Sequence, residues 1–192
     1  DYTYAELNGL ELNYRDNYRG GDTAVLYYLY VNGRYVLDSG EATSAIGFAH
    51  HGSSMVILKG IVNNALPAAR TFYEKTVIVH ESGHLLGLVD IGVDPVNPDH
   101  VDPDPRAAGA HCVFENCMMH WAVGPDDLLN SFLSGEEQEF DQCCRDDIAA
   151  AGGKATIATG ASVCEPPSEK GRLAPGPVAS HALDPYHPNI LF

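Results

Sequence analysis

The chain has 192 residues and a 45% hydrophobic content, which suit one globular domain with a real core. Its formal net charge of -15 and the lack of any apolar run of about 20 residues argue against nucleic-acid, anionic-membrane and membrane-spanning roles. The chain begins at Asp1 without a signal-peptide pattern, so we expect a processed or trimmed product.

Two extended pairs are predicted in the first third of the chain. Residues 23–37 are dominated by β-branched and aromatic residues, and Asn32-Gly33 is a strong signal for a hairpin turn. Residues 45–62 contain a second pair of short extended runs, separated by a Gly-Ser-Ser segment. We therefore expect two strand-turn-strand units before the first long helix.

Residues 68–88 predict one long helix. It follows Pro67, a residue typical of a first helical turn, and Gly87 suits its end. His80 and His84 are four residues apart, so they project from the same side of this helix.

The amino-acid composition changes after this helix. Segment 91–110 is rich in Asp and Pro, so we expect a loop there, with neither a helix nor a central strand. A second helix is expected to run from Ser134, as its cap, to about residue 151. Residues 152–192 predict an irregular tail rich in Gly, Pro and Ala.

The helix motif carries the strongest chemical signal. His80 and His84 can bind one Zn²⁺ through their imidazoles, and Glu81 can take a proton from the zinc-bound water and return it to a leaving amine. Gly87 lets the chain turn three residues later, and Asp90 is a residue type that binds zinc through oxygen. These residues predict a catalytic zinc site with His80, His84 and Asp90 as ligands.

The stretch 80–90, HESGHLLGLVD, resembles the metzincin signature HExxHxxGxxH with Asp in the last place. Met119, in the sequence Cys-Met-Met-His-Trp, matches the methionine that such proteins place in a turn beneath the zinc. Trp121 stands where astacin-type turns have a Tyr, and we expect it to line the pocket or to pack.

The resemblance implies an α+β fold with a twisted mixed sheet, an antiparallel edge strand near 45–51 or 54–58, and an active-site helix. Residues 1–151 would form the catalytic domain, with an upper subdomain to about residue 88 and a small irregular lower subdomain with a C-terminal helix. An extended peptide substrate could then pair with the edge strand through main-chain hydrogen bonds.

Two branches of the family fit different parts of the chain. The snapalysins end their motif in Asp, as here at Asp90. The archaemetzincins instead continue into HC-x4-C-x-M, which matches His111, Cys112, Cys117 and Met119. His111 is therefore the alternative third ligand to Asp90.

The chain has five cysteines: Cys112, Cys117, Cys143, Cys144 and Cys164. The first four lie within 33 residues of one another. Disulfides would explain this cluster, and so would a second, structural Zn²⁺ of the archaemetzincin kind. The adjacent pair at 143–144 departs from that family's C-x-x-C pattern, although Asp141 with Cys144 would restore the spacing. The acidic segment 91–110 could bind Ca²⁺, remain a solvated loop, or act as an inhibitory or partner-binding segment.

We expect a secreted or extracellular zinc metalloendopeptidase that acts on protein or peptide substrates as a monomer. Two alternatives stay open: a non-catalytic zinc- or calcium-binding module, and a zinc hydrolase that cleaves a non-peptide amide. The adjacent His50 and His51 lie outside the helix motif. We expect both at the surface, with metal binding there as the less favoured alternative.

Overall fold

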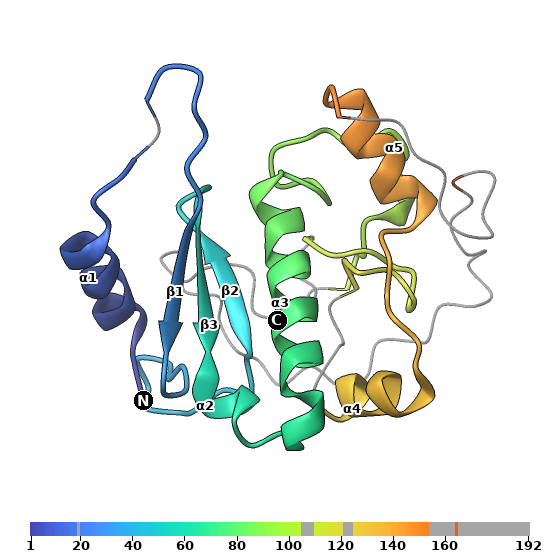
Figure 1. Cartoon of the computed structure of the whole chain (residues 1–192). Coiled ribbons are helices and arrows are strands. Elements are labelled where there is room, and N and C mark those ends of the chain that lie inside the picture. The colour runs from blue at the N-terminus through green and yellow to red at the C-terminus, as the bar shows by residue number, and fades with distance from the viewer. Residues whose placement is uncertain (19, 105–109, 121–124, 154–163, 165–192) are drawn as a thin grey trace.

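The computed structural model describes residues 1–18, 20–104, 110–120, 125–153 and 164. It is a mixed α+β fold in which a three-stranded sheet lies between helices (Figure 1). Its elements are, in chain order, α1 (Tyr4–Tyr14), β1 (Tyr27–Val31), β2 (Gly47–His50), β3 (Ser54–Leu58), α2 (Lys59–Val62), η1 (Pro67–Ala69), α3 (Arg70–Leu85), η2 (Pro98–His100), α4 (Pro125–Ser134) and α5 (Gln142–Ala150).

The sheet has the strand order β1-β3-β2. Strand β3 pairs in parallel with β1 and antiparallel with β2, so β2 is an antiparallel edge strand within the predicted range 45–51. Residues 51–53 join β2 to β3, which confirms the second predicted pair of strands. Each residue of β2 is buried, so this edge is not open to an added peptide in the structure.

The core forms on both faces of the sheet because both are covered. Met55 and Ile57 of β3 belong to a cluster with Val77 of α3, whereas Val56 and Leu58 belong to a cluster that includes Leu7 of α1 and lies on the other face. Every residue of β3 is therefore buried, as expected for a strand covered on both sides. Figure 1 shows α1 and α3 on opposite sides of the strands, with α4 and α5 beyond α3.

The first predicted hairpin is wrong. Strand β1 pairs with the later strand β3, and residues 33–37 form only isolated bridges. Gly33 serves close packing here: a Cβ at this position would lie 2.7 Å from the Tyr2 ring, and the Gly33 carbonyl accepts a hydrogen bond from the Gly60 N–H. Long-range contacts thus override the local turn signal.

The predicted helix at 68–88 is confirmed, with one turn of 3-10 helix at Pro67–Ala69 before α3. The helix predicted to start at Ser134 is wrong at its start, because Ser134 ends α4 and Asp141 caps α5. The Asp141 side chain accepts a hydrogen bond from the Cys144 N–H, 2.8 Å away. Nearly all of the predicted tail lies outside the described residues.

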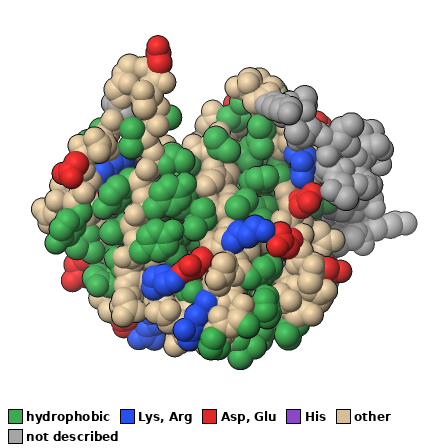
Figure 2. Space-filling view, in the orientation of Figure 1, with side chains coloured by type: hydrophobic (Ala, Val, Ile, Leu, Met, Phe, Trp, Pro, Cys, Tyr) green, Lys and Arg blue, Asp and Glu red, His purple; other side chains and the backbone are tan. Residues whose placement is uncertain are grey.

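Figure 2 shows hydrophobic side chains gathered over the strands on one face of the molecule. Leu26, Tyr28 and Tyr30, in or next to β1, are among the exposed hydrophobic residues. In the part of the chain that the structure describes, no helix is long and apolar enough to cross a membrane.

Candidate metal centres

Helix α3 carries the predicted zinc motif into the interior. It packs closely on β2 at Gly47, where a Cβ would lie 2.6 Å from Val77 Cγ1. His80 and His84 follow one and two turns later, and both are buried. The sequence spacing and the packing of α3 thus place both imidazoles away from solvent.

Three buried histidines converge at α3: His80, His84 and His111, which we call the histidine centre. Each offers a ring nitrogen within 4.8 Å of the others. The Nε2 atoms of His80 and His84 are 3.0 Å apart. Nitrogen ligands at about 2.0–2.1 Å around a tetrahedral zinc lie about 3.3 Å apart, so this pair fits a shared ion.

The ring of His80 is oriented by the main chain. Its Nδ1 lies 2.6 Å from the Met118 carbonyl oxygen, to which it can donate a hydrogen bond. That bond would leave Nε2, the atom nearest His84, without a proton and able to bind a metal. Burial, followed by the neighbouring histidines, lowers the pKa values of His80 and His84 well below their usual range. Their rings are thus neutral near pH 7, as metal binding requires.

Glu81, the residue after His80 on α3, is fully buried. Neither of its carboxylate oxygens has a partner in hydrogen-bond geometry within the described chain. Burial raises the pKa of Glu81 well above its usual range, and the nearby backbone of Ala49 in β2 only partly opposes this. An unpaired buried carboxyl group is costly, and it suits a role in proton transfer.

The structure does not bring Asp90 into the histidine centre, and His111 completes it instead. Helix α3 ends at Leu85, and Gly87 turns the chain with a φ of 85°. Leu88 and Val89 are then buried in a cluster with the cysteines, which leaves Asp90 exposed at the surface. The geometry therefore favours the alternative ligand His111 over Asp90.

Met119 is buried against α3 between the two helical histidines. A Cβ added at Gly83 would overlap the Met119 sulfur and lie 3.2 Å from the Phe140 ring. The small residue inside the motif is thus what lets Met119 pack against the helix, and its predicted place beneath a zinc ion stays a prediction. Trp121, the predicted pocket residue, lies outside the described residues.

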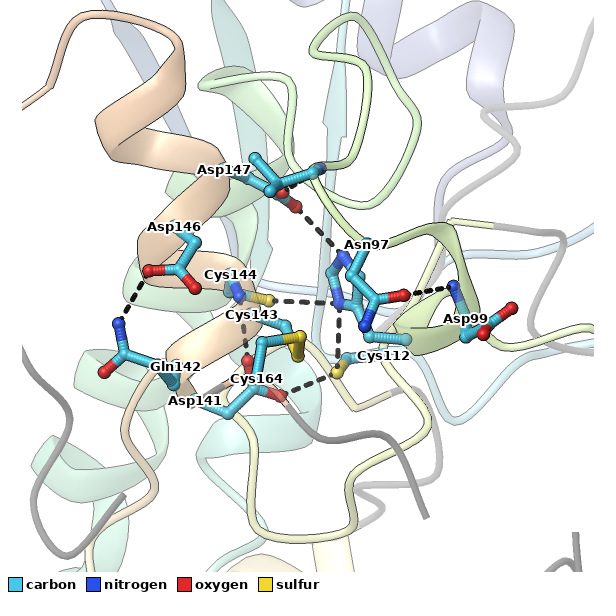
Figure 3. Close-up of a disulfide and its surroundings, with 12 residues drawn as sticks. Asn97, Asp99, Cys112, Asp141, Gln142, Cys143, Cys144, Asp146, Asp147 and Cys164 are labelled. Carbon is cyan, nitrogen blue, oxygen red and sulfur yellow. Dashed lines mark hydrogen bonds and ion pairs between the residues drawn. A yellow bond between two sulfur atoms is a disulfide. The ribbon is translucent and has the colours of Figure 1, made fainter. Parts of the chain in front are cut away.

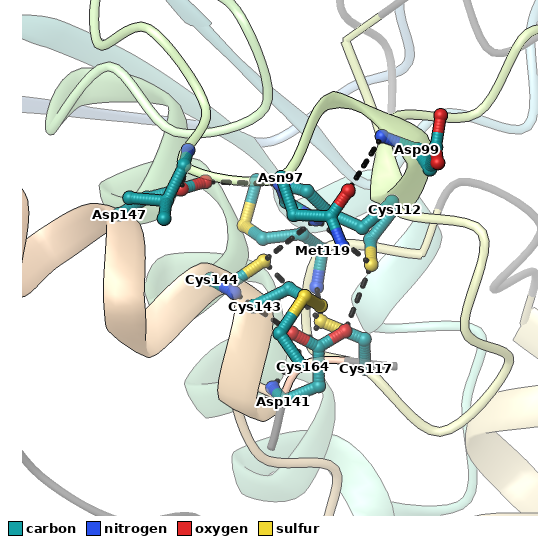
Figure 4. A network of polar contacts seen from close by, with 12 residues as sticks. Asn97, Asp99, Cys112, Cys117, Met119, Asp141, Cys143, Cys144, Asp147 and Cys164 are labelled. Carbon is teal, nitrogen blue, oxygen red and sulfur yellow. Dashed lines mark hydrogen bonds and ion pairs between the residues drawn. A yellow bond between two sulfur atoms is a disulfide. The ribbon is translucent and has the colours of Figure 1, made fainter. Parts of the chain in front are cut away.

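A second group of metal-binding side chains lies next to the first. It contains His100, Cys112, Asp141 and Cys144, whose donor atoms all lie within 4.8 Å of one another. Cys117 adjoins it, with its sulfur 3.7 Å from the Cys144 sulfur. We call these five residues the cysteine centre, and Figure 4 shows its three cysteines close together beside Asp141.

The distances in the cysteine centre fit zinc better than a disulfide. Two sulfurs that share a tetrahedral zinc at about 2.3 Å lie about 3.8 Å apart, whereas a disulfide requires about 2.05 Å. Cys112 Sγ is 3.6 Å and Cys144 Sγ is 4.0 Å from His100 Nδ1. Burial alone would raise the pKa of Cys117, but hydrogen bonds from the other two thiols and from two main-chain N–H groups bring it well below the usual value.

The histidine of this centre has a supporting carboxylate. His100 Nε2 lies 3.0 Å from Asp147 Oδ2, and the other Asp147 oxygen accepts a hydrogen bond from the Val96 N–H at 2.7 Å. A carboxylate behind a ligand histidine fixes the ring and makes it a better donor. Here it directs Nδ1 toward the sulfurs.

The remaining two cysteines form a disulfide, between Cys143 in α5 and Cys164 (Figure 3). The disulfide explanation therefore applies to Cys143 and Cys164, whereas a structural zinc at Cys112, Cys117 and Cys144 stays a prediction. The adjacent pair at 143–144 divides, because Cys143 pairs with Cys164 while Cys144 faces Cys112 and Cys117.

The acidic segment 91–110 has a structural role that the sequence did not indicate. Its 3-10 turn η2 delivers His100, and Val101 bridges to Cys112 in antiparallel fashion. The Asp102 N–H also donates to the His111 carbonyl oxygen at 2.8 Å. Within the described residues, no metal-binding group includes an Asp of this segment.

Three contributors to the two centres escaped the sequence analysis: the Met118 carbonyl, His100 and Asp147. A main-chain oxygen has no sequence signal, and a lone His in a loop gives only a weak one.

No family model, curated protein or solved structure matches the chain. A function can therefore be proposed only from the geometry of the two centres.

Proposed function

We propose that this chain is a zinc-dependent metalloendopeptidase with a metzincin-like active site. The observation that carries the proposal is the convergence of His80, His84 and His111, together with the fully buried carboxyl group of Glu81, the residue that follows His80 on α3. Three neutral donors with an adjacent acid are the set that zinc hydrolases use, in which the metal keeps an open position.

A zinc ion held there would polarise the scissile carbonyl and lower the pKa of a water molecule. The rest of the reaction falls to the protein. Glu81 accepts a proton from the attacking water at a carboxylate oxygen, and it delivers that proton to the leaving amine. Glu81 is fully buried, and the backbone of Ala49 in β2 lies near its carboxylate. The Met118 carbonyl would orient His80, while Met119 packs against Gly83 of the same helix.

The cysteine centre supports a second part of the proposal, a structural zinc bound by His100, Cys112, Cys117 and Cys144. Three thiolates and one imidazole are a common closed donor set for structural zinc. Asp141 is the alternative fourth donor, but one of its oxygens already caps α5. This ion would stabilise the segment that carries His111.

The test compares wild type with Glu81→Gln, which keeps the shape of the side chain and removes its proton transfer. Zinc content is measured by mass spectrometry, and cleavage by fluorescence of labelled casein. We expect Glu81→Gln to keep its zinc and to lose about 10²- to 10⁴-fold in kcat. Glu74→Gln, on the same helix, should stay close to wild type, because Glu74 pairs with Lys59 outside the centre.

Other outcomes distinguish the alternatives. Equal activity of Glu81→Gln and wild type would contradict the proposed role of the carboxyl group. Wild type that binds zinc but cleaves neither casein nor small amides would be a binding module. Cleavage of small N-acetyl amides without cleavage of casein would indicate a hydrolase of another amide class.

A further inference from the structure

A third group of polar side chains is buried far from the motif in sequence. Glu11 of α1, His50 of β2 and His51 of the following turn bring their donor atoms within 4.8 Å of one another. Glu11 and His50 are 2% and 7% exposed, whereas the side chain of His51 is 47% exposed. The expectation that both histidines lie at the surface is thus wrong for His50, because β2 is covered on both faces.

This group contains buried polar atoms whose hydrogen bonding is incomplete. Glu11 Oε2 and His50 Nε2 lie within ion-pair distance of each other but not in hydrogen-bond geometry, and His50 Nδ1 has no hydrogen-bond partner within the described chain. Burying such atoms costs stability unless something binds them. The other Glu11 oxygen is fully used, because it accepts hydrogen bonds from Arg15 Nη1 at 2.8 Å and from Ser54 Oγ at 2.5 Å. The carboxylate is therefore fixed, with Oε2 directed to the two histidines.

The distances match those between ligands of one metal ion. Glu11 Oε2 lies 3.1 Å from His50 Nε2 and 3.7 Å from His51 Nδ1. Nitrogen and oxygen ligands of a tetrahedral zinc lie about 3.3 Å apart. The other nitrogen of His51 is engaged, since its Nε2 lies 3.1 Å from the Tyr4 hydroxyl. The Tyr4 hydroxyl thus orients the ring so that Nδ1 faces the carboxylate, as residues behind a metal ligand commonly do.

We propose that Glu11, His50 and His51 bind a divalent transition-metal ion, with Zn²⁺ as the fitting occupant, and that this ion fastens α1 to the turn between β2 and β3. Two imidazoles and one carboxylate suit zinc and its neighbours, whereas calcium and magnesium prefer oxygen ligands alone. The half-exposed His51 leaves a route for the ion to enter. This third site is independent of the proposed peptidase activity.

The full chain is used for the test, with Zn²⁺ as the probe. Zinc that stays bound through gel filtration in metal-free buffer is counted per chain by mass spectrometry. We expect His51→Gln to hold one zinc fewer than wild type. Asp16→Asn removes a charge from an exposed neighbouring position and should hold as many as wild type. His51 is half exposed, so its variant should fold even if His50→Gln does not.

Hydrogen exchange gives a second measurement. Zinc should slow amide exchange in α1 of wild type and leave α1 of His51→Gln unchanged. Equal zinc counts in wild type and His51→Gln, with no effect of zinc on α1, would overturn the proposal. Peptidase activity is not measured, so this result stands apart from the test of Glu81.

Discussion

The histidine centre and the cysteine centre share one short segment of chain, yet their surroundings differ. His111 belongs to the first and its neighbour Cys112 to the second. The histidine centre has three donors and an unpaired acid, Glu81, whereas the cysteine centre has enough donors to enclose an ion and a carboxylate behind its histidine. The first arrangement leaves a position for a reacting molecule, and the second leaves none.

The shared segment also suggests that the histidine centre depends on the cysteine centre. The Met118 carbonyl orients His80, while the adjacent Cys117 lies in the cysteine centre. Segment 110–120 therefore carries groups of both centres, and under the proposed function its cysteines would fix the positions of His111 and the Met118 carbonyl. We expect substitutions in the cysteine centre to weaken metal binding at the histidine centre as well. Substitutions in the histidine centre should leave the cysteine centre unchanged.

The largest expected effect is that of Cys144→Ser. Structural zinc in small domains contributes on the order of 10 kcal/mol of folding free energy, so this variant should lose its structural zinc and the ordered packing of segment 110–120. Zinc content and the midpoint of thermal unfolding measure this, and casein cleavage should be lost as well. Cys143→Ser is the matched control, since it breaks the disulfide and should keep the metal. Unchanged zinc content in Cys144→Ser would refute the closed donor set.

Gly83→Ala should come next. Its added methyl group would overlap the Met119 sulfur, and overpacking of this kind costs about 1–3 kcal/mol of unfolding free energy. Urea denaturation gives that value. Gly9→Ala, in α1, has no atom within 4 Å of its new Cβ and should stabilise the chain by about 0.5–1 kcal/mol. A neutral Gly83→Ala would show that Met119 does not pack against the helix in this way.

Asp147→Asn is expected to have the smallest of these effects. It keeps the size of the side chain but weakens the support of His100, and such second-shell changes cost about 10- to 100-fold in metal affinity. Competition with a chelator measures that affinity. Asp146→Asn is the neighbouring control, because Asp146 accepts a hydrogen bond from Gln142 and does not face His100. Equal affinities for the two variants would show that Asp147 does not support His100 as a metal ligand.

The sequence predicted those parts that depend on local spacing. The i, i+4 pair at His80 and His84 and the turn at Gly87 after α3 follow from short-range patterns, whereas the antiparallel edge strand was implied by the family resemblance. Strand β1 was misread because its partner β3 lies more than twenty residues further along the chain. Helix α4 was missed although Pro125 and two acidic residues mark its start.

The third ligand of the histidine centre likewise could not be chosen from local spacing. Asp90 has the expected spacing from His84, but spacing does not reveal which side of a turn is buried. Leu88 and Val89 are buried with the cysteines, and that hydrophobic packing leaves Asp90 at the surface. His111 reaches α3 only through a bridge between the acidic segment and Cys112. Such a long-range arrangement has no local signal.

Zinc counted per chain in His111→Ala and Asp90→Ala tests the central claim most directly. The three-histidine arrangement predicts that His111→Ala loses one zinc equivalent together with casein cleavage, while Asp90→Ala retains the zinc and the activity of wild type. Loss of zinc from Asp90→Ala with full retention by His111→Ala would contradict it.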